Sequence, residues 1–169
     1  MVCLVVAQAK LFGLTPTECY KCIADFDVRQ HWDGIFCEFG VVDTLNDYQD
    51  VIYMRLKAPW GITDRDFLQK RTVTKNYAGY EYLMHFEHAE HPNKPNRKDH
   101  IRAITIISGY LFKQSPDNPN DTEVYIVAQT DIRGMIPVML VNYNSAKAPK
   151  NWIKDFQKKG SKLKKEGKL

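Results

Sequence analysis

A long run of strand patterns that ends in one helical segment is the feature that most constrains this chain. Between residues 35 and 133, stretches rich in β-branched and aromatic residues alternate with turn-forming Asn, Asp, Gly and Pro. In Tyr80–His88 the even positions are mostly apolar or aromatic, and the odd ones, apart from Leu83, are polar, as in a strand with one buried face. After residue 137 the apolar residues that can form one side of a helix are Val138, Leu140, Val141, Ile153 and Phe156. One helix therefore has to cover one face of an antiparallel sheet.

The elements expected from these patterns follow a simple order. A Val-rich strand covers residues 2–9, and Thr15-Pro16-Thr17-Glu18 gives a capping box for a helix that ends near Ala24. A short helix covers residues 28–32, and Pro149 is expected to kink or divide the last helix. Between these helices we expect six strands, over residues 35–45, 50–57, 66–75, 80–88, 101–112 and 122–133. The fold class is α+β: a curved antiparallel sheet wraps around a long C-terminal helix in a helix-grip.

Positive charge is concentrated at the end of the chain. The net charge is +4, and nine lysines from Lys147 onward face only Asp155 and Glu166. Such an end favours an anionic surface, either phospholipid head groups or nucleic acid. Because the chain lacks a reading helix or a stacking platform, we expect no nucleic acid. We expect one domain over residues 1–158 and a Lys-rich tail over 159–169, which is alternatively a solvated, frayed end.

The apolar runs and the cysteines exclude further classes. No apolar run reaches the ~20 residues of a membrane-spanning helix. The first nine residues are too short for a signal peptide, so we expect a cytoplasmic protein. The four cysteines (Cys3, Cys19, Cys22 and Cys37) carry no mark of secretion, so a disulfide framework is not expected. Cys19 and Cys22 fall inside a predicted helix without a second pair to close a zinc site, which indicates packing.

The sequence also contains none of the common catalytic motifs. GxSxG, HExxH and the P-loop are absent, and Ser108 is an inward-facing Ser without an evident base. His85 and His88 face opposite sides of their predicted strand, so with His91 they do not form a metal site. We therefore expect no catalytic residue, no metal and no cofactor.

Five short segments occur in an order that is typical of one family. They are residues 27–33 (DVRQHWD), 58–67 (APWGITDRDF), 101–103 (IRA), 130–137 (TDIRGMIP) and 140–142 (LVN). Together they resemble START domains, the steroidogenic-acute-regulatory-protein-related lipid transfer domains, and among them the phosphatidylcholine transfer type. The resemblance implies that one lipid, a glycerophospholipid by this likeness, is bound in an internal hydrophobic tunnel and moved between membranes without chemistry. The alternative is a ligand-sensing or cyclase-like helix-grip protein that acts on another hydrophobic small molecule.

The resemblance has a gap at the start of the chain. Family members usually begin with a helix and two strands upstream of the strand expected over residues 2–9. Either the protein is a shortened member, or another segment or chain completes the sheet. Because an unpaired sheet edge favours association, a dimer through this edge is an open alternative.

Two arginines are candidates for the lipid head group. On the strand expected over residues 101–112, Arg102 shares a face with Ile104, Ile106 and Tyr110, and a buried guanidinium needs a carboxylate or an anionic ligand. The resemblance implies that Arg65, at the mouth of the cavity, holds the lipid phosphate. Adjacent residues of a strand face opposite sides, so Asp66 is expected to stabilise the nearby loop instead.

The remaining candidates concern the ligand and the pocket wall. By resemblance Asp33 matches an acid of the ceramide carrier, but Met54 stands where that carrier has Gln and cannot replace its hydrogen bonds, which disfavours ceramide. Tyr82, Met84 and Phe86 can line the pocket, where aromatic faces would attract a choline ammonium, or pack the core.

A membrane gate is expected at one end of the cavity. Trp60 lies between Pro59 and Gly61, and an exposed Trp is typical of a membrane interface. By resemblance the segment with Met135, Ile136 and Val138 flanks the same opening. We expect these residues to contact an anionic membrane transiently, although Trp60 can also fold back as a lid.

Overall fold

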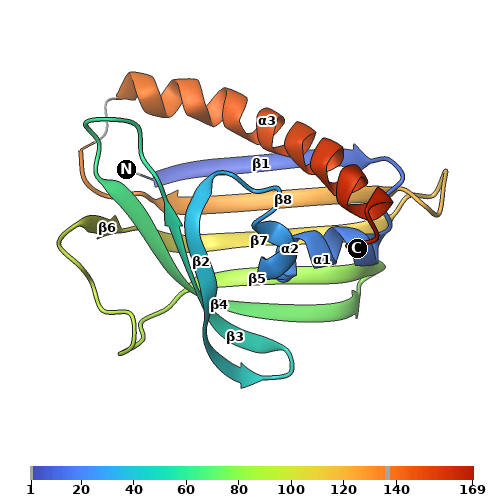
Figure 1. Cartoon of the computed structure of the whole chain (residues 1–169), viewed down its shortest axis with the longest axis horizontal. Coiled ribbons are helices and arrows are strands. Elements are labelled where there is room, and N and C mark those ends of the chain that lie inside the picture. Colours follow the sequence, from blue (N-terminus) through green and yellow to red (C-terminus); the bar gives the residue numbers. More distant parts are fainter. Residues whose placement is uncertain (1, 136–137) are drawn as a thin grey trace.

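The computed structural model describes residues 2–135 and 138–169, including their side chains except those of Cys3 and of residues 138–146. An eight-stranded sheet curves strongly, and one long helix lies across its concave side (Figure 1). The strands are β1 (Val2–Leu11), β2 (Phe36–Asn46), β3 (Gln49–Leu56), β4 (Asp64–Tyr77), β5 (Tyr80–His88), β6 (His100–Arg102), β7 (Ile104–Gln114) and β8 (Thr122–Asp131).

The strands run in the order β1-β8-β7-β5-β4-β3-β2, and each neighbouring pair in this order is antiparallel. The short β6 pairs in parallel with β4. The α+β helix-grip architecture expected from the sequence is confirmed. Since β1 is the first strand of this order and has β8 as its only described partner, association through its outer edge stays a prediction.

Two short helices close one end of the sheet. Helix α1 (Pro16–Ala24) begins with the predicted capping box: the Thr15 side chain accepts from the Glu18 amide, and the Glu18 carboxylate accepts from the Thr15 amide. Helix α2 (Phe26–Arg29) is shorter than expected and starts two residues earlier. Cys19 and Cys22 of α1 are fully buried, and burial raises the pKa of both thiols to about 12. Both thiols therefore stay protonated and pack as small apolar groups.

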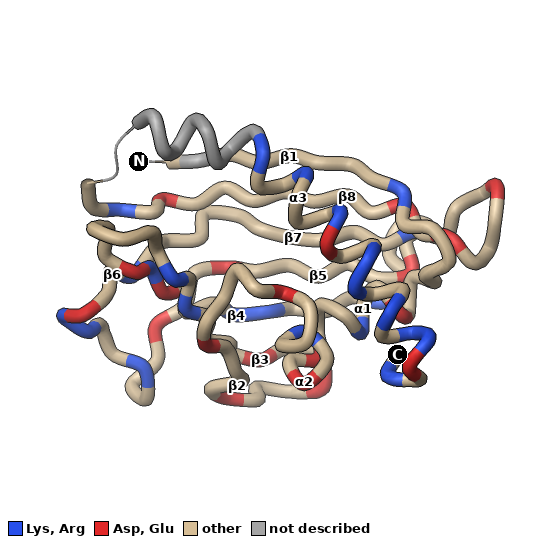
Figure 2. The backbone as a smooth tube through the Cα atoms, turned by 45° about the horizontal axis from the view of Figure 1, so that its top comes forward, with Lys and Arg blue, Asp and Glu red and all other residues tan. Residues whose placement is uncertain are grey.

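Helix α3 (Val138–Lys165) continues to the last residues of the chain. Pro149 lies inside α3 without dividing it. The lysines gather on its second half (Figure 2), yet Leu163 is buried and Lys164 forms an ion pair of 2.9 Å with Glu18 of α1. The expected boundary at residue 158 therefore does not mark the end of packing, because one side of the last turns is held against α1. No helix among the described residues is long and apolar enough to cross a membrane.

The prediction of one continuous strand over residues 101–112 is wrong, because the segment forms two strands, β6 and β7. The chain leaves the edge of β4 at Arg102, passes through the buried Ala103 and enters β7 beside β8. A bulge between Thr105 and Ile107 then shifts the pairing with β8 and leaves Ile106 49% exposed. Alternation cannot be carried across a break and a bulge, so Arg102, Ile104 and Ile106 do not share a face with Tyr110.

Candidate lipid-binding site

The face of the sheet beneath α3 is packed at one end and more open at the other. Near α1, Leu11 of β1 and Val124 of β8 are fully buried, in one core cluster with Phe156 of α3. Toward the other end of the same two strands, small residues such as Ala7 and Ala128 remain half-exposed, although they face the same side. The concave face thus changes from a solid core to a surface lined by small side chains.

Arg65 lies on this concave face, at the more open end. It is 4% exposed, and its guanidinium donates to three backbone carbonyls: Ile132 at 3.1 Å, Arg133 at 2.8 Å, and Thr63. Among the described residues, no carboxylate forms an ion pair with it. Burial lowers the pKa of Arg65 for this reason, since nothing with a full negative charge offsets the loss of solvent.

Gly134 makes room for this guanidinium. Its φ is +68°, and a Cβ at this position would lie 2.9 Å from Nη2 of Arg65 and 2.7 Å from Cδ1 of Ile101. Only glycine combines that backbone conformation with such a close approach. Gly134 in the sequence therefore indicated a tight turn with a close neighbour, although the sequence could not show that this neighbour is Arg65.

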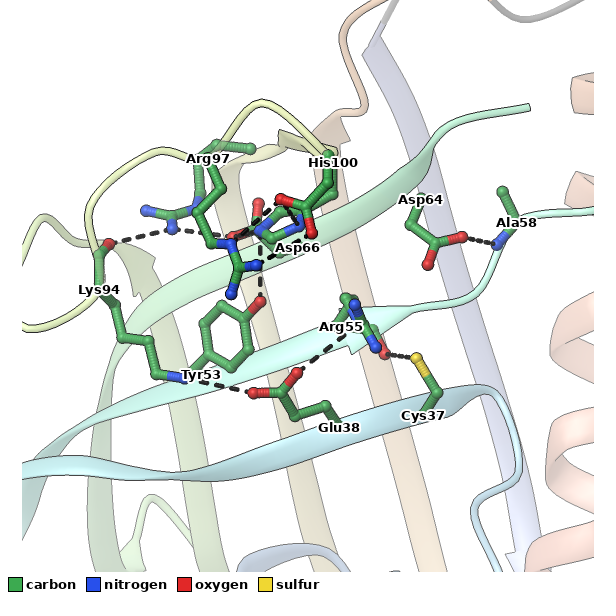
Figure 3. A network of polar contacts seen from close by, with 12 residues as sticks. Cys37, Glu38, Tyr53, Arg55, Ala58, Asp64, Asp66, Lys94, Arg97 and His100 are labelled. Carbon is green, nitrogen blue, oxygen red and sulfur yellow. Dashed lines mark hydrogen bonds and ion pairs between the residues drawn. The ribbon is translucent and has the colours of Figure 1, made fainter. Parts of the chain in front are cut away.

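Asp66, the neighbour of Arg65, lies on the opposite face and anchors a buried polar network (Figure 3). Its Oδ2 lies 2.8 Å from Nη2 of Arg102 and 3.0 Å from Nε2 of His100. The side chains of these three residues are at most 8% exposed. The hydroxyl of Tyr53 lies 3.4 Å from Nε2 of His100, the same ring nitrogen that contacts Asp66. Arg102 also donates to the Lys94 carbonyl, which ties the loop over residues 89–99 to the sheet.

This network bears on the two interpretations of Arg102. The cation is buried, as expected, and its partner is the carboxylate of Asp66. The structure thus favours a structural ion pair over a contact with the lipid head group for Arg102. The role expected for Asp66 belongs to Asp64, whose carboxylate accepts from the Ala58 amide in the loop (Figure 3).

Asp33 is likewise engaged in a buried ion pair. Arg29 of α2 donates to its carboxylate through Nε and Nη2, both at 2.9 Å, and the Asp33 side chain is fully buried. The Arg29 guanidinium also lies 5.3 Å from the ring centroid of Phe36. Sequence reasoning missed Arg29, although its i,i+4 spacing from Asp33 was a signal.

The family of the chain follows from comparison with known proteins. The family model "START domain" matches residues 5–165. This chain belongs to the START domain family. The mouse and human proteins named START domain-containing protein 10 are each 30% identical to it over 126 residues, 75% of this chain and 42% of either relative. The chain therefore spans less than half the length of the curated relatives it matches.

Solved structures agree with this fold. The crystal structure of human STARD10 superposes with a TM-score of 0.85 at 27% identity, over 96% of this START domain and 64% of that chain. Human StAR-related lipid transfer protein 5 superposes with a TM-score of 0.82 at 20% identity, over 94% of this START domain and 76% of that chain.

The predicted pocket residues of this START domain divide into two groups. Met84 and Phe86 are buried in the core, and Tyr110 stacks between Phe112 and Trp152 at centroid distances of 6.1 and 5.9 Å. Tyr82 stacks on Tyr20 of α1 at 4.4 Å. These four lie on the concave face, toward the packed end, while Ile104 and Ile106 are separated from them by the bulge.

The expected gate residues include the most exposed apolar side chains of this START domain. Trp60, in the loop between β3 and β4, is 102% exposed and Met135 is 97% exposed. The β3–β4 loop and the segment between β8 and α3, which carry these residues, lie at the end of the sheet where α3 begins (Figure 1). Trp60 therefore does not fold back as a lid. Ile136 and the side chain of Val138 lie outside the described residues.

Proposed function

We propose that this START domain binds a single lipid between the concave face of the sheet and α3, and transfers it between membranes without chemical change. The observation that supports the proposal best is Arg65, a buried cation with no carboxylate partner among the described residues, at the more open end of that face. Human StAR-related lipid transfer protein 5 is named as a lipid transfer protein, and the shared fold suits the same role here.

The head group that suits Arg65 is a phosphate, so the proposed ligand is a glycerophospholipid. A guanidinium presents a planar fork of donors, and three backbone carbonyls leave part of that fork free. A phosphate oxygen accepts such a charge-assisted hydrogen bond, whereas a sterol offers a neutral hydroxyl. The acyl chains would lie against the half-exposed small residues of β1 and β8, including Ala7 and Ala128.

Native mass spectrometry of the purified chain is expected to show one phospholipid per protein, with diacyl glycerophospholipids ahead of sterols and ceramide. Extraction and lipid analysis of the same sample would name the class. Sterol, or a polar small molecule in place of lipid, would contradict the proposed ligand, and a chemically altered product after incubation would favour the cyclase-like alternative.

Trp60→Ala is expected to slow phospholipid transfer between liposomes about tenfold, with the fold unchanged. The side chain is fully exposed in the free protein and would be buried when it enters a membrane. Burying a large apolar side chain contributes about 1.5–3 kcal/mol, so its loss weakens the docked state by about tenfold or more. The measurement is the initial rate of fluorescent phospholipid transfer.

Phe12→Ala is the matched control for Trp60→Ala. Phe12 is 61% exposed in the turn between β1 and α1, at the opposite end of the sheet from the Trp60 loop (Figure 1). Its removal is expected to leave transfer unchanged. If both variants transfer at the rate of the parent protein, Trp60 has no part in membrane docking.

A further inference from the structure

A second hollow lies beneath the loop that joins β5 to β6, on the side of that loop facing β7. Its volume is about 490 Å³, and the end of β5, the loop, the start of β7 and the turn after β8 form its walls. Lys94, Arg102 and Arg133 line it, with the imidazoles of His88 and His91. Glu90 is the one carboxylate among its described lining residues. Lys94 pairs with Glu38 at 3.2 Å and Arg102 with Asp66 at 2.8 Å, so Arg133 is the lining cation on which ligand binding depends.

Two buried nitrogen atoms in this wall have no hydrogen-bond partner among the described residues: Nε of Arg102 and Nδ1 of His88. Arg102 already binds Asp66 through Nη2, which fixes the orientation of its guanidinium. A buried polar nitrogen without a partner is unfavourable. An anion with several oxygen atoms is an acceptor that can satisfy the Nε–H of Arg102.

The pKa of His88 is shifted by burial and by the positive charges in the wall of the hollow. Burial lowers the pKa of His88, the charges of Arg102 and Arg133 lower it further, and Glu90 acts in the opposite direction. Two guanidinium groups therefore act on one imidazole at the wall of the hollow. An anion is the class of ligand that such an arrangement stabilises.

We propose that this hollow binds a phosphate monoester, supplied by the phosphorylated head group of a membrane lipid. Arg133 is separated from the fully exposed Met135 by Gly134 alone, and its carbonyl accepts from Arg65. The hollow thus opens at the same end of the molecule as Trp60 and Met135. When these two side chains enter the bilayer, Arg133 lies level with the head-group phosphates. Its planar guanidinium can then bind two phosphate oxygens in parallel.

The site is separate in its residues from the one proposed for the transferred lipid. Arg65 does not line the hollow, and Arg133 meets Arg65 through its backbone carbonyl, which leaves its side chain to the hollow. Phosphate binding here can therefore be measured whether or not a lipid is transferred. It would direct the domain to membranes by their phosphorylated lipids.

The test uses the full chain, with inorganic phosphate and vesicles as the two probes. Inorganic phosphate is titrated at constant ionic strength while NMR follows the His88 ring and the Arg133 amide. Phosphatidylcholine vesicles with and without a phosphatidylinositol monophosphate are used in a flotation assay. Arg133→Gln removes one charge from the hollow, and Lys98→Gln removes one charge from an exposed position of the same loop that does not line it.

Phosphate is expected to shift both resonances in the parent, in Lys98→Gln and in Arg65→Met, and Arg133→Gln is expected to weaken binding about tenfold. Stronger flotation with the phosphorylated lipid, lost in Arg133→Gln alone, identifies a membrane head group as the source.

Phosphate binding without that preference identifies free phosphate as the ligand and overturns the membrane source. Arg133→Met provides a second variant if Arg133→Gln is not folded. Unshifted resonances, or equal losses in Arg133→Gln and Lys98→Gln, overturn the site.

Discussion

Arg65→Met is expected to weaken phospholipid binding about 10- to 100-fold, so that less lipid co-purifies with the chain. A hydrogen bond to a charged group contributes about 1.5–3 kcal/mol, which corresponds to this range in affinity. Met has a similar length and no donor, so it removes the head-group contact without opening a large hole. The measurement is the molar ratio of phospholipid to protein after purification, followed by reloading from vesicles.

The stability of Arg65→Met has to be measured beside its lipid content. The substitution leaves the carbonyls of Ile132, Arg133 and Thr63 without their present donor. It also removes a buried charge that no described carboxylate neutralises, and this offsets part of the loss. Arg65→Lys keeps the charge without the planar fork and should bind an intermediate amount of phospholipid. A folded Arg65→Met protein with the lipid content of the parent would show that Arg65 does not hold the head group.

Asp66→Ala is expected to lower the free energy of unfolding by about 3–5 kcal/mol, because removal of one partner leaves a buried cation uncompensated. Asp66 joins Arg102 at 2.8 Å and His100 at 3.0 Å, with its own side chain 1% exposed. Without it the loop over residues 89–99 also loses the pair that orients Arg102 toward the Lys94 carbonyl. Urea unfolding followed by circular dichroism measures the change.

Asp99→Ala is the control, since Asp99 contacts the same imidazole from the exposed side. Its side chain is 53% exposed and lies 3.2 Å from Nδ1 of His100. An exposed ion pair contributes about 0–1 kcal/mol, so the change should be small. Equal destabilisation by Asp66→Ala and Asp99→Ala would mean that burial of Asp66 has no energetic consequence.

The double variant Asp66→Leu with Arg102→Met separates the two interpretations of Arg102. Replacing both members of a buried ion pair by apolar residues is often neutral, so stability should recover relative to Asp66→Ala. If Arg102 serves the ion pair alone, the double variant keeps the phospholipid content of the parent. Loss of phospholipid in a stable double variant would instead return Arg102 to the lipid site.

Local patterns predicted most of the elements correctly. The capping box at Thr15 and Glu18 marks the start of α1 within one residue, and the alternation in Tyr80–His88 gives β5 with its exact bounds. Both signals come from interactions between residues that are close in sequence. The order of such elements also predicted a curved sheet with one covering helix, because a single amphipathic helix has one face to bury.

The errors concern places where neighbours in space replace neighbours in sequence. The strand over residues 101–112 reads as continuous, but pairing with β4 holds its first part and pairing with β8 holds the rest. The last turns of α3 read as a charged tail, yet contacts with α1 bury Leu163 and Gly160. Composition alone cannot show that a Lys-rich segment has one packed side.

The sequence by itself determined the fold class, the order of the elements and the chemical types at the site: two arginines, an acid beside a Trp, and an exposed Trp. Tertiary structure alone decided which arginine has a carboxylate. Adjacent positions on β4 send Arg65 and Asp66 to opposite faces, and the break before β7 brings Arg102 to Asp66. The energy of a buried charge depends on the groups around it in space, and these come from residues up to 68 positions apart in the sequence.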